Sequence, residues 1–166
     1  MSRAFSLFAF AGLVLAPSLA CTAGTSSTNC PLNTCQSGAV VQLYANVTRD
    51  VMAKASITAC LNGGCVTGAP ASIPSSPGDR LSVSLQGALV VQGFISSPDP
   101  VKGYLVEADF TLSDSSPADG DEYKLAVVSN GEAVPGSVDQ KVTYMKSTPN
   151  GASCPPICDN VTVAAN

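Results

Sequence analysis

Short segments in which apolar and polar residues alternate run through most of this chain, and this alternation limits the folds that it can adopt. In the segment 104–112, for example, every second residue is apolar. A period of two places all the apolar side chains on one face of a β-strand. Similar segments lie at 41–48, 53–59, 81–85, 123–127, 142–144 and 161–163. A more continuous apolar run at 88–95 is expected to be a strand that is covered on both faces.

These segments are separated by turns rich in Gly, Pro, Asn, Asp and Ser, and none shows the 3.6-residue period of an amphipathic helix. Parallel neighbours would need a long crossover, usually a helix, so antiparallel pairing is expected. The pattern therefore predicts an all-β fold class: a single antiparallel β-sandwich of seven or eight strands.

The core of this sandwich has to be built mainly from small aliphatic residues. Aromatic residues make up 5% of the 166 residues, and Trp is absent. Each small side chain buries little apolar area, at about 25 cal/mol per Å². Covalent cross-links would therefore help to stabilise the fold. The length fits one domain.

The first twenty residues have the three parts of a secretory signal peptide. Arg3 supplies a positive charge, residues 4–15 form an apolar run, and Ser18-Leu19-Ala20 ends in small residues suited to cleavage after Ala20. The apolar run is shorter than the roughly 20 residues that cross a membrane. We therefore expect residues 1–20 to be removed, leaving a mature chain without a transmembrane helix.

Cys21 directly follows the expected cleavage site. Ser18-Leu19-Ala20-Cys21 resembles the lipobox of bacterial lipoproteins, in which the cysteine thiol carries lipid and becomes the new N-terminus. The resemblance implies a membrane partner, a lipidated flexible tether over 21–35 and a folded domain over 36–166. Thr22 stands in place of the Asp that retains some lipoproteins at the inner membrane, which favours the outer membrane. The alternative is an ordinary signal peptide before a mature chain that begins with Cys21.

The other six cysteines form three close pairs in the sequence: Cys30/Cys35, Cys60/Cys65 and Cys154/Cys158. In an exported protein such an even set predicts three disulfides. Either each pair closes a local loop, or only the middle pair does and two bridges join the N-terminal pair to the C-terminal pair. Asn62-Gly63 favours a tight hairpin that brings the middle pair together. Zinc binding is the competing interpretation, which the spacing and the secretion signal do not favour.

The segment Asp119-Gly120-Asp121-Glu122-Tyr123-Lys124-Leu125 resembles the tyrosine corner of immunoglobulin-like folds. The resemblance implies that the Tyr123 hydroxyl bonds to the backbone just upstream, within an immunoglobulin-like or fibronectin type III-like sandwich. The Cys-Trp-Cys core of antibody domains is missing. Cys60-x4-Cys65 and the segment 149–158 also resemble small myxobacterial cell-envelope lipoproteins of unknown function, a resemblance that implies no activity.

Charge and composition argue against most enzyme chemistry. The net charge is −4 with no basic cluster, so nucleic acid is not an expected partner. His is absent, which removes the commonest general base. Glu107 and Asp109 lie about 7 Å apart on one face of a predicted strand, and paired carboxylates hydrolyse glycosides. Sugar sites usually add aromatic residues, so we interpret this pair as a surface that promotes solubility.

The densest acidic stretch contains Asp114, Asp119 and Asp121, which are candidates for a calcium site because calcium prefers carboxylate oxygens in loops. Their spacing does not match an EF-hand, and the Asp-Gly pair favours a solvated turn. No metal and no cofactor is therefore predicted.

Taken together, these features predict a non-enzymatic lipoprotein of the cell envelope that serves as a binding or structural module for an unknown protein or glycan ligand. Loops at the ends of a sandwich are a common place for such binding. The alternatives are an unanchored secreted adhesin or matrix protein, and a carbohydrate-active enzyme.

Overall fold

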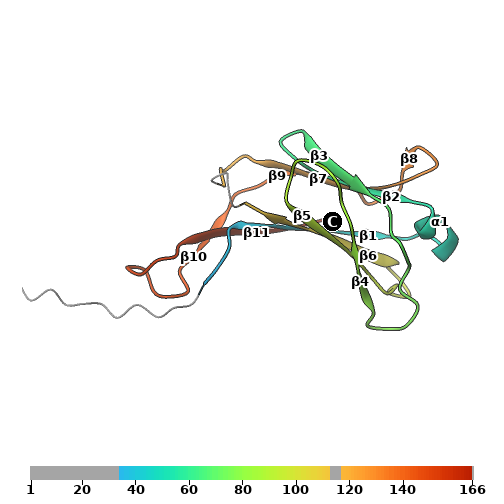
Figure 1. Cartoon of the computed structure of the whole chain (residues 1–166), viewed down its shortest axis with the longest axis horizontal. Helices are drawn as coiled ribbons and strands as arrows, with labels where there is room; N and C mark the ends of the chain where they lie inside the picture. Colours follow the sequence, from blue (N-terminus) through green and yellow to red (C-terminus); the bar gives the residue numbers. More distant parts are fainter. Residues whose placement is uncertain (1–33, 113–116, 166) are drawn as a thin grey trace, which may run out of the picture.

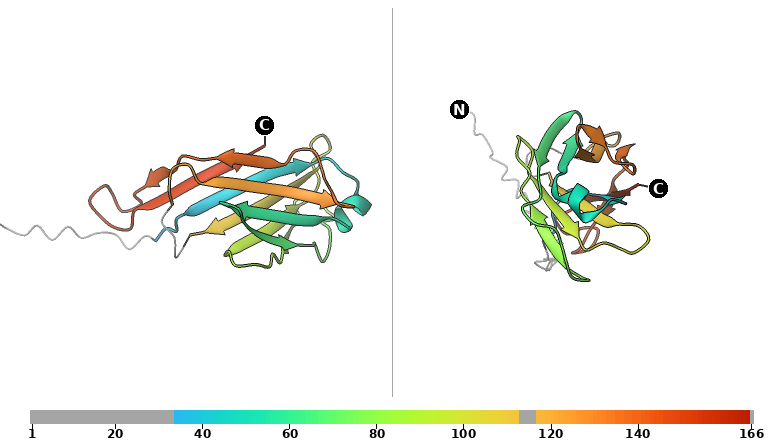
Figure 2. Two further views of the ribbon diagram at one scale, coloured as in Figure 1. Left: turned by 90° about the horizontal axis from the view of Figure 1, so that it is seen from above. Right: turned by 90° about the vertical axis from the view of Figure 1, so that its right-hand side faces the viewer.

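Two β-sheets lie one over the other in the computed structural model, which describes residues 34–112 and 117–165 (Figures 1 and 2). The six-stranded sheet, here called sheet A, has the order β10 (Met145–Ser147), β11 (Cys158–Ala164), β1 (Gly38–Ala45), β6 (Tyr104–Thr111), β5 (Val91–Ser96) and β4 (Arg80–Val83). The five-stranded sheet, sheet B, has the order β3 (Gly64–Gly68), β2 (Ser56–Leu61) and β7 (Glu122–Ser129), with β8 (Glu132–Ala133) and β9 (Val138–Lys141) both paired to β7.

The hydrophobic core fills the space between the two sheets. Along β6 and the first six residues of β7, buried residues alternate with more exposed ones. One hydrophobic cluster contains the inward-facing residues of both sheets, among them Val41, Leu43 and Val106 from sheet A and Ile57 and Leu125 from sheet B. The predicted all-β class is therefore confirmed, because each alternating segment on a long strand turns one apolar face inward.

Strand number and pairing differ from the prediction. The described residues form eleven strands rather than seven or eight, because β8, β9 and β10 are two to four residues long and too short to show alternation. The segment predicted at 142–144 lies between β9 and β10. One pair of neighbours is parallel, since Gly38 to Gln42 of β1 align with Asn160 to Ala164 of β11. β1 and β11 are the first and last strands of the described chain, and the strands between them make the connection, so no crossover helix is needed.

A short helix, α1 (Arg49–Ala53), replaces the start of the strand predicted at 53–59. Thr48 caps it, with its Oγ1 accepting a hydrogen bond of 3.4 Å from the backbone N–H of Val51. Met52 is fully buried, and the Arg49 guanidinium donates to the backbone carbonyls of Ile73 and Pro74. A helix of one turn is too short to show a 3.6-residue period, which explains why it was missed.

The apolar run at 88–95 is a strand only in its second half, where β5 begins at Val91. Val90 is 60% exposed, and in β5 itself Gly93 and Ile95 are buried while Gln92 is exposed. The prediction of a strand covered on both faces was therefore wrong.

The hairpin between β2 and β3 has the turn expected from Asn62-Gly63. Both residues have positive φ, 50° and 83°, and Cys60 stands directly opposite Cys65. Asn and Gly adopt this left-handed backbone at low cost, which is why the pair marks a two-residue hairpin.

The molecule has two distinguishable ends (Figures 1 and 2). The near end holds the start of β1, the start of β11 and the loop 148–157, and the far end holds α1 and the turn between β7 and β8. Because β1 and β11 are parallel, their first residues lie together at the near end. No helix in the described part of the chain is long and apolar enough to cross a membrane.

Candidate binding face on the six-stranded sheet

The outward side of sheet A carries a group of polar side chains that strand register brings together. Glu107 on β6 stands opposite Phe94 on β5 and Gln42 on β1. Asp109, two residues further along β6, stands opposite Gln92. Their neighbours Val106 and Ala108 are fully buried in the core, so these side chains point the other way. We call Gln42, Arg80, Gln92, Phe94, Glu107 and Asp109 the polar face.

Arg80 on the edge strand β4 holds this face together. Its guanidinium lies 3.5 Å from the centroid of the Phe94 ring, a cation–π contact. It also forms an ion pair with Glu107 and approaches the Oδ2 atom of Asp109 to 3.7 Å. The second oxygen of Glu107 accepts a hydrogen bond of 2.6 Å from the Gln42 amide. Side chains from β1 and β4 thereby meet Glu107 of β6.

Asp109 is less well satisfied. Its Oδ1 atom is buried and has no hydrogen-bond partner among the described residues. Burial raises the pKa of this carboxyl above its ordinary value, the Glu107 charge raises it further, and Arg80 partly opposes both. A buried carboxylate oxygen without a partner is unusual in a folded protein. It needs a donor beyond the described residues, such as water or a ligand.

Two hollows adjoin the polar face. One of about 210 Å³ is lined by Asp109, Val40, Thr111 and Asn160, among others. A second of about 360 Å³ lies along β4 and β5 and is lined by Phe94, Gln92 and Ser82, among others. The polar groups therefore border recesses in the sheet surface.

Both carboxylates that the sequence placed on one strand face have polar neighbours. The two carboxylates that the sequence placed on one strand face do lie together, but Arg80 sits beside both and Gln42 occupies the remaining oxygen of Glu107. Sequence reasoning missed Arg80, Gln42 and Phe94, because only strand register shows that they join Glu107.

A second polar cluster lies at the start of β7. The Tyr123 hydroxyl is 2.5 Å from the Tyr144 hydroxyl, which in turn donates a hydrogen bond of 2.9 Å to Asp121. In place of the upstream backbone contact expected of a tyrosine corner, Tyr123 contacts this side chain from the segment between β9 and β10. Burial raises the pKa of both phenols above the ordinary value, and the hydrogen bond to Asp121 raises that of Tyr144 further.

The two described calcium candidates, Asp119 and Asp121, accept hydrogen bonds from neighbouring residues. One Asp121 oxygen accepts from the Asn62 side chain, and the other accepts from the backbone of Ala118 and from Tyr144. Burial raises the pKa of Asp121, but these three hydrogen bonds outweigh it and lower the pKa overall. Asp119 accepts from the backbone N–H of Tyr144, and Asp114 lies outside the described residues. Residues 34–112 and 117–165 contain no group of three His, Cys, Asp or Glu side chains that could hold a metal ion.

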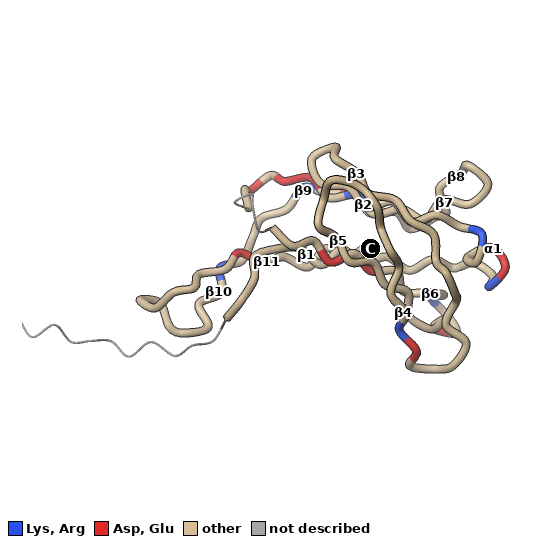
Figure 3. Tube along the Cα trace, viewed as in Figure 1, with Lys and Arg blue, Asp and Glu red and all other residues tan. Residues whose placement is uncertain are grey.

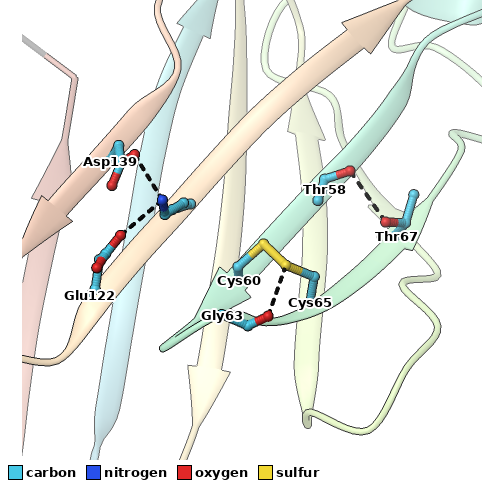
Figure 4. Close-up of a disulfide and its surroundings, with 8 residues drawn as sticks. Thr58, Cys60, Gly63, Cys65, Thr67, Glu122 and Asp139 are labelled. Atoms are coloured by element: carbon cyan, nitrogen blue, oxygen red, sulfur yellow. Dashed lines mark hydrogen bonds and ion pairs between the residues drawn. A yellow bond between two sulfur atoms is a disulfide. The ribbon is translucent and has the colours of Figure 1, made fainter. Parts of the chain in front are cut away.

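The cysteines of the described residues form disulfides rather than a zinc site. Cys60–Cys65 cross-links the β2–β3 hairpin on the outward side of sheet B, beside the ion pairs of Lys124 with Glu122 and Asp139 (Figure 4). Cys35–Cys158 joins the start of β1 to the start of β11, across 123 positions of sequence.

These two bridges exclude three local loops and agree with the alternative in which only the middle pair is local. Cys154 is also disulfide-bonded. Cys21, the predicted lipidation site, and Cys30 lie outside the described residues.

Charged side chains are sparse along the described trace, and acidic and basic residues are interspersed (Figure 3). No protein-family model, no curated protein and no solved structure was found to match this chain. What the protein does must therefore be inferred from its own residues.

Proposed function

We propose that this protein is a non-enzymatic lipoprotein of the cell envelope, anchored through lipid on Cys21, and that its folded part is a binding module of the immunoglobulin-like sandwich type. The outer membrane is the proposed site, because Thr22 stands where inner-membrane retention would require Asp.

The observation that carries this proposal is the disulfide set. Cys35–Cys158 and Cys60–Cys65 are disulfides, and such bonds persist in oxidising compartments outside the cytosol. Cys154 is also disulfide-bonded, and Cys30 is predicted to be, so Cys21 is the odd cysteine, and it stands directly after Ser18-Leu19-Ala20. A seventh cysteine has no partner for a disulfide within the chain, and lipidation would account for its thiol.

The position of Cys35 supports a short tether. Thirteen residues separate Cys21 from Cys35. A chain extends by at most about 3.3–3.6 Å per residue, so Cys35 would stay within about 50 Å of the lipid. Since the Cys35–Cys158 bridge lies at the near end, we propose that this end faces the membrane and that α1 and the β7–β8 turn face away from it.

The immunoglobulin-like assignment is part of the proposal and has two supports. The chain forms two layers of mainly antiparallel strands around one hydrophobic cluster. Tyr123 is buried at the start of a long central strand, as in a tyrosine corner, although its hydroxyl has a side-chain partner here. A binding role is proposed in preference to catalysis because Arg80 and Gln42 engage Glu107 on the polar face.

The test is the intact mass of the protein isolated from its native envelope, measured before and after reduction. We expect the mass of residues 21–166 plus a lipid, increasing on reduction by two hydrogens for each disulfide. A Cys21→Ala variant should appear in the medium or soluble fraction without lipid. A lipid-free mass for the native protein would refute the anchor and favour the secreted adhesin or matrix protein.

A further inference from the structure

We propose that the polar face of sheet A, formed by Gln42, Arg80, Gln92, Phe94, Glu107 and Asp109, binds a neutral saccharide. This inference rests on the proposed function, because it names the ligand class of the binding module.

The first support is the set of hydrogen-bonding groups that the fold leaves available. Gln92 is exposed, and its amide has no hydrogen-bond partner among the described residues. Gln42 uses its amide N–H toward Glu107, which leaves its carbonyl oxygen as an acceptor. Arg80 contacts the carboxylates through one of its terminal nitrogens and retains further N–H donors. Donors and acceptors are thus interspersed on one surface, and a sugar hydroxyl can both donate and accept.

The second support is Asp109. Its buried Oδ1 atom has no partner within the described chain, while the residue itself lines the hollow of about 210 Å³. The Asp109 side chain is 35% exposed, so a ligand hydroxyl seated in that hollow can donate to the accessible side of the carboxylate, and a rotation of the side chain would bring Oδ1 within reach. Hydroxyl donors fit here, whereas an anion would meet the carboxylates of both Asp109 and Glu107.

The third support is charge. Arg80 is the single cation of the polar face, and it forms ion pairs with both carboxylates, Glu107 and Asp109. Phosphate or carboxylate ligands are bound by groups of unpaired cations, and none is present on this face. A cationic ligand would have to compete with Arg80 for the same two carboxylates. A neutral polar ligand is the class that this balance favours.

The fourth support is shape. The polar groups lie across neighbouring strands, which are about 4.8 Å apart in a sheet, and the hollows of about 210 and 360 Å³ adjoin them. Val40 stands opposite Asp109 on the outward side of sheet A and adds apolar surface to one hollow, which suits the C–H face of a sugar ring. An oligosaccharide that lies across these strands would therefore contact both hollows.

The experiment is isothermal titration calorimetry of the exported, disulfide-bonded protein with a panel of neutral hexasaccharides: those of glucose in β-1,4, β-1,3 and α-1,4 linkage, of mannose, of xylose and of N-acetylglucosamine. An acidic hexagalacturonate is included. We expect at least one neutral hexasaccharide to bind more tightly than about 1 mM, and to shift the backbone amide resonances of β1, β5 and β6.

The variants are chosen so that loss of folding does not mimic loss of binding. Gln92→Ala removes an exposed side chain without partners, and we expect at least a fivefold weaker affinity for that hexasaccharide. Asp109→Asn should weaken it at least tenfold. Glu122→Gln is the matched control, because it removes a carboxylate that is paired with a cation on the outward side of sheet B. Its affinity should be unchanged.

Three results would overturn the inference: no binding by any neutral hexasaccharide, binding by the acidic one alone, or a bound hexasaccharide whose affinity is insensitive to Gln92→Ala and Asp109→Asn. None of these results bears on the lipid at Cys21, which the intact mass measures independently. The two proposals can therefore fail separately.

Discussion

The hydroxyls of Tyr123 and Tyr144 lie 2.5 Å apart and connect the two sheets at the point where the chain passes between them. Tyr123 begins the inward face of β7 in sheet B, and Tyr144 precedes β10 in sheet A. The Tyr123 ring also meets Phe110 of sheet A edge to face, with 4.9 Å between ring centroids. Tyr144 continues the connection to Asp121, so a short hydrogen-bonded chain fixes the path of residues 142–144.

Removing both hydroxyls of this pair should cost less than the sum of the two single removals. Tyr144→Phe leaves the fully buried Tyr123 hydroxyl without its partner, and an unpaired buried hydroxyl costs about 1–3 kcal/mol. We expect Tyr144→Phe to lower the free energy of unfolding in urea by that amount. The double variant with Tyr123→Phe should lose less than the sum of the two single variants, with a coupling of about 0.5–3 kcal/mol. Strict additivity would show that the two hydroxyls do not interact in solution.

The same pair predicts a loss of stability in alkali. Burial raises the pKa of both phenols above the ordinary value of about 10. The unfolded chain therefore releases these protons at lower pH than the folded protein does. Their contribution to stability is fully present below about pH 10 and decreases as the pH rises through the pKa values of the folded protein. Urea unfolding on both sides of pH 10 should show a steeper decrease for the native protein than for the double Phe variant, and equal slopes would contradict this explanation.

The core residues of the long strands could be predicted from the sequence, because burial of one strand face produces an alternation of apolar and polar residues. The segment 104–112 predicted β6 with its alternation, and Tyr123, Leu125 and Val127 proved fully or almost fully buried. Asn62-Gly63 predicted its hairpin because the signal is local and stereochemical.

Features that depend on distant segments could not be predicted. The parallel pairing of β1 with β11 joins residues at opposite ends of the folded part and leaves no local pattern. The sequence predicted only part of the polar face, because Glu107 and Asp109 lie on one strand and share its outward side. Arg80 and Gln42 come from other strands, and only the fold determines the register that brings them to Glu107. The partner of Tyr123 likewise lies 21 positions away along the chain.

The two disulfides should differ in their effect on stability. A disulfide lowers the entropy of the unfolded chain, and the resulting gain in free energy of unfolding grows with the length of the loop that it closes. A loop of 123 positions, as for Cys35–Cys158 alone, corresponds to about 5 kcal/mol. The loop of 5 positions closed by Cys60–Cys65 corresponds to about 2 kcal/mol. Because a second bridge between the terminal pairs would keep the long loop closed, the comparison is made in a Cys30→Ser/Cys154→Ser background. In that background we expect Cys35→Ser/Cys158→Ser to lose more free energy of unfolding than Cys60→Ser/Cys65→Ser. Both double variants avoid a free thiol, so they are matched. An equal or reversed order would show that the near end is held together without its bridge.

Asp109 and Asp121 should respond to pH with opposite signs. Burial and the Glu107 charge raise the pKa of Asp109 in the folded protein, so ionising it disfavours the fold. That penalty is absent below the ordinary aspartate pKa of about 3.9 and complete above the folded pKa. Asp109→Asn removes it, and the variant should therefore gain stability relative to the native protein on going from about pH 3 to pH 7.

Asp121 provides the contrasting case. Although its burial acts in the opposite direction, hydrogen bonds from Asn62, Ala118 and Tyr144 lower its pKa. Its ionised form therefore favours the fold above about pH 3.9, and this contribution is lost as the pH falls through the folded pKa. Asp121→Asn should lose stability relative to the native protein between about pH 3 and pH 7, where Asp109→Asn gains it. Urea unfolding of the three proteins at both pH values tests the pair, and shifts of the same sign would show that the surroundings of one carboxylate differ from those described.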